Sequence, residues 1–92
     1  MIRIAVREGG TVRTVRLEGS RIEIGSAPEA ALRLRGAGVS PRHSVLRVLR
    51  AGLEVLDQAS REGTILNGTR VSRAPLHAGD TLTIGSVSVV VE

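Results

Sequence analysis

The stretch Val39-Ser40-Pro41-Arg42-His43 is the part of the chain from which the fold can be identified. It brings a hydroxyl, a guanidinium and an imidazole group together within a few residues. Apolar runs typical of β-strands lie on both sides of it, so we expect it to form a loop between strands. The other polar residues that stand out are Ser26, Arg61, Glu62 and Asn67, and they fall in other predicted turns. The functional question is whether those turns meet this loop at one site.

Outward from that loop, short strand patterns alternate with turn signals in both directions along the chain. Strands are predicted at 2–7, Thr11–Leu17, Arg21–Ile24, Leu32–Leu34, Ser44–Leu49, Leu53–Leu56, Thr64–Leu66, Thr81–Ile84 and Val87–Val91. A break in the apolar alternation within Thr11–Leu17 predicts a β-bulge. Pro75 and Gly79 mark the segment after Gly68 as a connection. No sustained helical period occurs, and the pattern predicts an all-β fold, a two-sheet antiparallel β-sandwich.

The length of the chain, 92 residues, predicts a single domain over residues 1–92. Apolar residues make up 41% of the sequence, but Phe, Tyr and Trp are absent, so the core must be built from Val, Leu and Ile. Each of these contributes roughly 1.5–3 kcal/mol when fully buried. Without cysteine there can be no disulfide or thiolate metal site. No signal peptide and no apolar run of about 18 residues is present, so we expect a cytoplasmic module that does not enter a membrane.

The net charge is +4, and all thirteen of the Lys and Arg residues are arginines. Residues 33–73 hold eight arginines against three acidic residues, a surplus of five positive charges. One interpretation is an anionic partner near the central loops. The other is a solvated, arginine-rich surface with no ligand. The sequence supports both interpretations equally.

Four motifs in the correct order resemble the forkhead-associated (FHA) domain family. Ile24-Gly25 is similar to the family's Ile/Leu-Gly-Arg, and Val39–His43 to its Val-Ser-x-x-His. The segment from Asp57 to Gly68 is similar to Asp-Leu-Gly-Ser-x-Asn-Gly-Thr-x-Val-Asn-Gly. Leu76-His77-Ala78-Gly79-Asp80, followed by Ile84-Gly85, resembles the late Leu-x-x-Gly-Asp and Ile-Gly pair. The resemblance implies a β-sandwich of the FHA/SMAD type whose loops at one end grip a phosphothreonine peptide, with no cofactor.

The resemblance also implies which positions would contact the phosphopeptide, and most of them have changed here. The family's phosphate-binding Arg is replaced by Ser26, the basic residue after Ser40 by Pro41, and the peptide-clamping Asn by Glu62. Proline lacks an N–H donor, and an ionised glutamate cannot donate a hydrogen bond. Losing two charged hydrogen bonds, each worth about 1.5–3 kcal/mol, would weaken binding by several powers of ten. Ser40 is the one inherited phosphate contact.

Arg61 is the one residue in this motif that can compensate, with Arg42 as a second cation. It can equally pair with Glu62 or Asp57, and we prefer that interpretation because most exposed arginines have no measurable role. The remaining matched residues are expected to shape the loops: Gly25, His43, Asp57, Gly63, Asn67 and Gly68.

An enzymatic function is not predicted. Ser40 and His43 lie in one loop without an oxyanion hole, and no metal-ligand spacing occurs. We therefore predict a non-catalytic protein–protein interaction (adaptor) module of FHA type, with lost or weakened phosphothreonine dependence and a protein or phosphopeptide partner. One alternative is phosphothreonine-peptide binding in signalling through Ser40, Arg61 and Arg42. Another is weak nucleic-acid binding, which has the charge but no aromatic platform or recognition helix. The oligomeric state is not specified by the sequence.

Overall fold

The computed structural model describes residues 1–92 and contains eleven β-strands and no helix. In chain order the strands are β1 (Ile2–Glu8), β2 (Thr11–Leu17), β3 (Arg21–Gly25), β4 (Leu32–Arg33), β5 (Ser44–Leu49), β6 (Gly52–Asp57), β7 (Thr64–Leu66), β8 (Thr69–Val71), β9 (Arg73–Leu76), β10 (Thr81–Ile84) and β11 (Val87–Val91). No helix is therefore long and apolar enough to cross a membrane.

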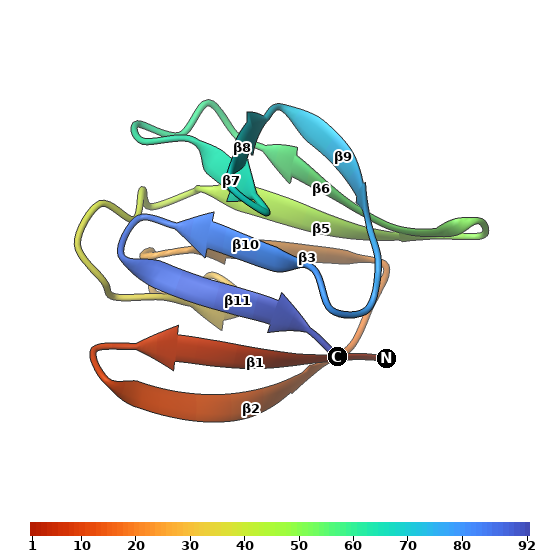
Figure 1. Cartoon of the computed structure of the whole chain (residues 1–92), viewed down its shortest axis with the longest axis horizontal. Helices are drawn as coiled ribbons and strands as arrows, with labels where there is room; N and C mark the ends of the chain where they lie inside the picture. The colour runs from red at the N-terminus through yellow and green to blue at the C-terminus, as the bar shows by residue number, and fades with distance from the viewer.

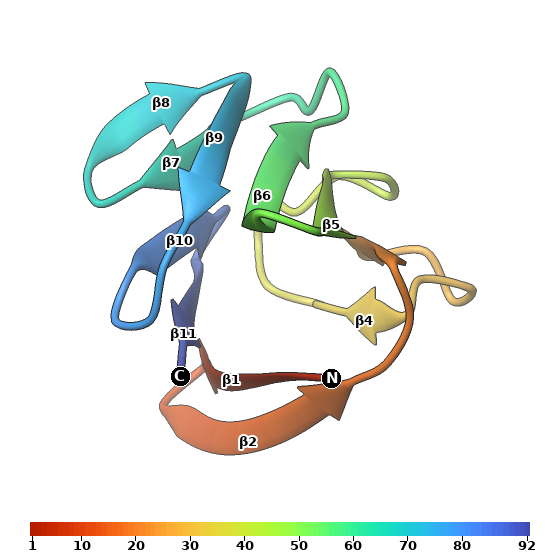
Figure 2. The same ribbon diagram turned by 90° about the vertical axis from the view of Figure 1, so that its right-hand side faces the viewer.

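The strands form two sheets that pack face to face (Figures 1 and 2). The larger sheet has six strands in the order β2-β1-β11-β10-β7-β8, and the smaller has five in the order β4-β3-β5-β6-β9. All strand pairs are antiparallel except β3 with β4. The prediction of an all-β, two-sheet sandwich is confirmed.

The core between the sheets consists entirely of aliphatic side chains, as the absence of aromatic residues requires. Alternate residues of each strand point inward, because side-chain direction in a strand has a period of two. The buried cluster is Ile4, Val6, Leu17, Ile22, Ile24, Leu32, Leu34, Leu46, Val55, Leu76, Leu82, Ile84, Val87, Val89 and Val91. The last strand places three of its five residues in this cluster, as its alternating valines indicate.

The predicted bulge in Thr11–Leu17 is wrong. Strand β2 pairs with β1 without interruption, from Ile2 opposite Leu17 to Glu8 opposite Thr11. The apolar alternation breaks because Val12 points to the outer face of the sheet, where it is 57% exposed. Arg13 instead occupies the position on the inner face, opposite Val6. Its guanidinium nitrogen lies 3.9 Å from a carboxylate oxygen of Glu8.

The segment after Gly68 was predicted as a connection but contains strands β8 and β9. Both are short and lie at the edges of their sheets, β8 beside β7 and β9 beside β6. Pro75 lies within β9, opposite Glu54. An edge strand tolerates proline because its outer N–H groups need no partner. Proline and turn residues therefore remove the strand pattern from the sequence of this segment, although the strands still form.

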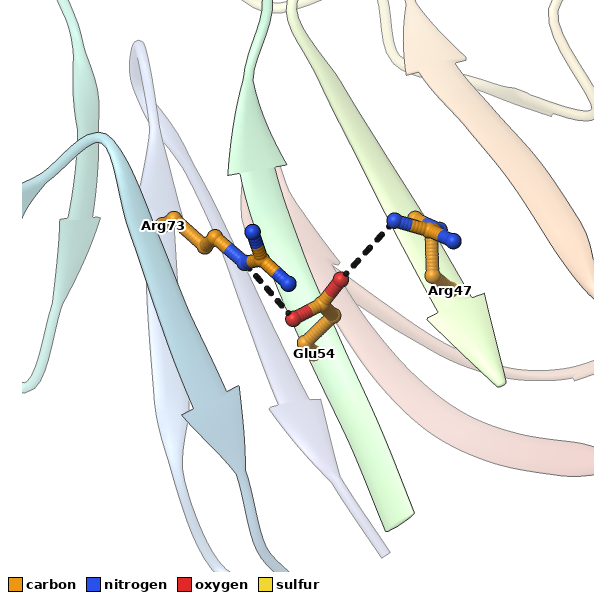
Figure 3. Close-up of polar contacts among 3 residues, drawn as sticks. All are labelled: Arg47, Glu54 and Arg73. Carbon is orange, nitrogen blue, oxygen red and sulfur yellow. Dashed lines mark hydrogen bonds and ion pairs between the residues drawn. The ribbon is translucent and has the colours of Figure 1, made fainter. Parts of the chain in front are cut away.

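The outer face of the smaller sheet carries a buried carboxylate held by two arginines. Glu54 of β6 is only 7% exposed and accepts hydrogen bonds from Arg47 of β5 at 3.3 Å and Arg73 of β9 at 3.0 Å (Figure 3). The three side chains link three adjacent strands. The arginines thereby satisfy a carboxylate that would be costly to bury alone.

Candidate functional site

A groove of about 360 Å³ lies at one end of the sandwich, between the β4–β5 and β6–β7 loops. Both loops emerge at the end of the sandwich opposite the β5–β6 hairpin (Figure 1). The groove is lined by Gly38, Val39, Ser40, Pro41, Arg61 and Glu62. Two of the predicted turns therefore meet at a shared surface.

The β4–β5 loop is held in place by the end of strand β3 and the residue after it. Gly25, at the end of β3, lies so close to this loop that an added Cβ atom would be 2.0 Å from the carbonyl oxygen of Pro41. The amide of Ser26 donates to the Ser40 carbonyl at 3.0 Å, and the amide of His43 to the Ile24 carbonyl at 2.9 Å. Glycine is required at this position by the close approach of the backbone, since no side chain fits.

His43 joins the two loops that border the groove. Its ring is fully buried, and Nδ1 accepts a hydrogen bond from the Ser40 amide at 3.1 Å. The proton is therefore on Nε2, which donates to the Gly63 carbonyl at 2.8 Å. The ring contacts the amide of Ser40, not its hydroxyl, so the geometry of a nucleophile and its base is not formed.

A second buried network lies below the β6–β7 loop and centres on Asp57. Its carboxylate accepts hydrogen bonds from the side chain and amide of Ser60 and from the hydroxyl of Thr64. Thr64 in turn accepts from the Ser44 hydroxyl at 2.7 Å, and Ser60 accepts from the Gly63 amide at 2.9 Å. Burial acts to raise the pKa of Asp57, but the hydrogen bonds outweigh it and the pKa is lowered below its ordinary value of 3.8. The ionised carboxylate thus fixes the shape of the loop.

Ser40 presents its hydroxyl between the two loops. Its oxygen accepts a hydrogen bond from the Arg61 amide at 3.0 Å. The hydroxyl hydrogen has no partner within the chain, so Ser40 can still donate to a ligand in the groove. This hydrogen bond also positions residue 61 at the wall of the groove.

The two charged residues that line the groove have opposite signs. Arg61 and Glu62 are both exposed, and they do not form an ion pair with each other. Arg61 does not form an ion pair with Asp57 either. The pairing preferred for Arg61 from the sequence is therefore absent. The carboxylate of Glu62 lies against Gly38, where an added Cβ atom would overlap it. Its negative charge thus occupies the wall formed by the β4–β5 loop.

Arg42 and Ser26 do not line this groove. Arg42 faces a separate small cavity of about 40 Å³ that is also lined by Pro41, Ala27 and Glu29. Ser26 is half-buried, and its carbonyl accepts a hydrogen bond at 2.9 Å from Nε of Arg33. No sequence pattern indicates this contact, because Arg33 follows Ser26 by seven residues and the contact depends on how the chain turns between them.

Asn67 and Gly68 lie at the other end of β7, away from the groove. They form the two-residue turn between Leu66 and Thr69, with positive φ angles of 48° and 88°. The Asn67 side chain donates to Asp80 at 3.0 Å and accepts from the Thr81 amide at 2.9 Å. These contacts join the turn to β10.

The comparisons with known proteins agree with this architecture. The family described as the inner membrane component of the T3SS, cytoplasmic domain, matches residues 10–92. The chain belongs to this family, and its fold is that of an FHA domain. It is similar to the FhaA FHA domain in its complex with the intracellular domain of Rv3910, with a TM-score of 0.90, 28% identity and 100% coverage of both chains.

A second FHA structure, from a structural and functional analysis of phosphothreonine-dependent FHA domain interactions, has a TM-score of 0.86 and 28% identity. The match covers 98% of this chain and 95% of that one. The FHA domain is also 35% identical over 77 residues to the ABC transporter ATP-binding/permease protein Rv1747 of Mycobacterium tuberculosis. That match covers 84% of this chain but only 9% of the transporter, so the chain spans less than a tenth of this relative.

Proposed function

We propose that this FHA domain binds a segment of a partner protein in the groove between the β4–β5 and β6–β7 loops, without strict dependence on phosphothreonine. FHA domains are protein-interaction modules, and two of the related structures concern a complex with an intracellular protein domain and phosphothreonine-dependent interactions. The groove lies between the two loops that carry the FHA-like motifs, and its lining includes one cation and one anion.

The observation that carries the proposal is the charge balance of the groove. Arg61 and Glu62 are its only charged residues, so a dianionic phosphate would meet one cation and one anion. Pro41 offers no N–H donor, and Ser26 supplies no cation. A protein segment with an unmodified hydroxyl, amide or single charge suits this groove better than a phosphate does. The Ser40 hydroxyl, Arg61 and Glu62 supply a donor, a cation and an acceptor to such a segment.

Phosphothreonine binding through Ser40 and Arg61 is the second candidate. It is favoured by two observations: Arg61 has no ion pair, and the Ser40 hydroxyl hydrogen is free. Arg42 does not join this pair, because its side chain lines a different cavity. This candidate therefore has one guanidinium at the phosphate.

The two candidates are separated by titrating fluorescently labelled phosphothreonine peptides and their unphosphorylated twins. A label is needed because the chain has no Trp or Tyr. We expect the affinities of each pair to differ by less than about tenfold, which corresponds to 1.4 kcal/mol. Arg61→Ala and Ser40→Ala should weaken both peptides to a similar extent. Micromolar binding of the phosphorylated peptides alone, abolished by both variants, would instead establish the second candidate. Binding that ignores peptides and falls steeply with salt would favour nucleic acid.

A further inference from the structure

The outer face of the larger sheet carries an unbalanced positive charge. The strand registers place twelve side chains on this face: Arg3, Ala5, Arg7, Val12, Thr14, Arg16, Ile65, Arg70, Thr81, Thr83, Ser88 and Val90. Four of the twelve are arginines and none is acidic. The acidic residue Glu92 directly follows β11 and borders this face beside Arg3, because its amide donates to the Arg3 carbonyl at 3.0 Å.

None of these arginines forms an ion pair, in contrast to the outer face of the smaller sheet. There, Arg47 and Arg73 share the carboxylate of Glu54 (Figure 3). On the larger sheet, Arg3 and Arg16 are directly opposite each other on β1 and β2. Like charges in this arrangement destabilise a sheet, and neither arginine forms an ion pair with a carboxylate. An acidic ligand would relieve this repulsion.

Between the arginines, the face is hollowed to a volume of about 250 Å³. The hollow is lined by small or short side chains together with Arg7: Ala5, Val12, Thr81, Ser88 and Val90. Arg3 lies two residues before Ala5 on β1, and Arg7 lies two residues after it. At the rise of a β-strand, the backbone positions of the two arginines are about 13 Å apart. Cations therefore flank a partly apolar depression.

We infer that this face is a docking surface for an acidic segment of a partner protein, with an aliphatic side chain in the hollow and carboxylates on the arginines around it. The hollow favours a protein over a lipid surface or a nucleic-acid backbone, which would need only protruding cations. No aromatic residue is available for base stacking. The surface is separate from the loop groove, since the two share no lining residue.

The test is an NMR titration with a defined probe, an acetylated nine-residue peptide that repeats Glu-Val-Ser. The amide signals of Ala5, Thr14, Ser88 and Val90 should shift, and those of Ser40 and Arg61 should not. The double variant Arg3→Gln/Arg16→Gln should weaken binding by at least about tenfold, because it removes two cations from the surface. The control is Arg21→Gln/Arg50→Gln, which removes the same charge from exposed positions elsewhere and should retain the affinity.

Four results would overturn the inference. The first is equal binding of a twin peptide with Gln in place of Glu, and the second is an equal loss of affinity in both double variants. The third is that the shifts appear in the loop groove instead. The fourth is displacement of the peptide by a single-stranded oligonucleotide or by phosphatidylserine vesicles at equal charge and salt, which would assign the face to that class of ligand.

Discussion

At the level of single residues, the resemblance to FHA domains implies that the site differs from a phosphothreonine site mainly at positions 26 and 62. Ser26 stands where the family has an arginine, and Glu62 where it has the peptide-clamping asparagine. The loops that carry these residues are joined by hydrogen bonds: the Ser26 amide donates to the Ser40 carbonyl, and the Arg61 amide donates to the Ser40 hydroxyl. Positions 26, 40 and 61 are therefore linked by hydrogen bonds that do not depend on the side chains of residues 26 and 62.

Introducing an arginine at position 26 and an asparagine at position 62 should increase the dependence of binding on phosphate. The double variant Ser26→Arg/Glu62→Asn adds a cation and an amide donor and removes a negative charge from the groove. We expect the ratio of affinities for phosphorylated and unphosphorylated peptides to rise by at least about tenfold, as one charge-assisted hydrogen bond of roughly 1.5–3 kcal/mol suffices for this. Paired peptide titrations measure the ratio. Glu62→Gln alone is the control, and a ratio unchanged in the double variant would contradict the role given to these positions.

His43 is the second residue whose side chain matters for the site. His43→Ala leaves the Ser40 amide and the Gly63 carbonyl without partners and opens a cavity at a fully buried position. The free energy of unfolding should fall by about 2–5 kcal/mol. The matched control is His77→Ala, since that ring is 77% exposed and its removal should change stability by less than about 0.5 kcal/mol. Urea denaturation followed by far-ultraviolet circular dichroism compares the two, and equal losses would refute the bracing role.

At the level of elements, the strands were more accessible to sequence reasoning than the contacts between loops. Period-two alternation predicted nine of the strands correctly, because each of them buries the side chains on one of its two faces. It missed β8 and β9, where exposed edges and Pro75 remove the signal. It also assigned Val12 to a bulge, since nothing in the sequence shows that Arg13 points inward. For the groove, the sequence predicts the two loops but not that they lie side by side. Their contact depends on the hydrogen bond between the Arg61 amide and the Ser40 hydroxyl, which joins residues far apart in the chain.

The β6–β7 loop depends on an ionised Asp57, and this makes its stability sensitive to acid. The pKa of Asp57 is lower in the folded chain than its ordinary 3.8. The stabilisation is therefore fully present above the unfolded pKa and is lost as the pH falls through the lowered, folded value. We expect the free energy of unfolding to be steady from about pH 5 to 7 and to decrease below about pH 4.

The contribution of Asp57 to this acid sensitivity can be isolated with Asp57→Asn. This variant should be less stable than the parent at pH 7 and should lose less stability between pH 5 and 3. Some acid sensitivity will persist, because the hydrogen bond from Asn67, then that from the His77 amide, also lower the pKa of Asp80. Glu62→Gln serves as a control, since no hydrogen bond stabilises that carboxylate. Identical pH profiles for Asp57→Asn and the parent would exclude Asp57 as the source.

At the level of the whole molecule, the two ends of the chain meet in the middle of the larger sheet. Strand β1 pairs with the last strand, β11, on one side and with β2 on the other (Figure 2). Its inward residues Ile4 and Val6 are fully buried. The outer face of the same strand supplies Arg3 and Arg7 to the docking surface. The first strand thus contributes both to closing the core and to the surface chemistry.

Removal of residues 1–9 should therefore unfold the domain, although the family match begins only at residue 10. The deletion removes two fully buried side chains, leaves β11 without its partner and separates β2 from the sheet. Burial of Ile4 and Val6 alone represents about 3–6 kcal/mol, comparable to the whole stability of a marginal domain of this size. Far-ultraviolet circular dichroism and amide NMR dispersion report folding directly. Deletion of Met1, which is 62% exposed, is the control and should leave the spectrum unchanged. A dispersed spectrum from residues 10–92 would show that β2 can replace β1 beside β11, and that the first strand is an addition to a core that folds without it.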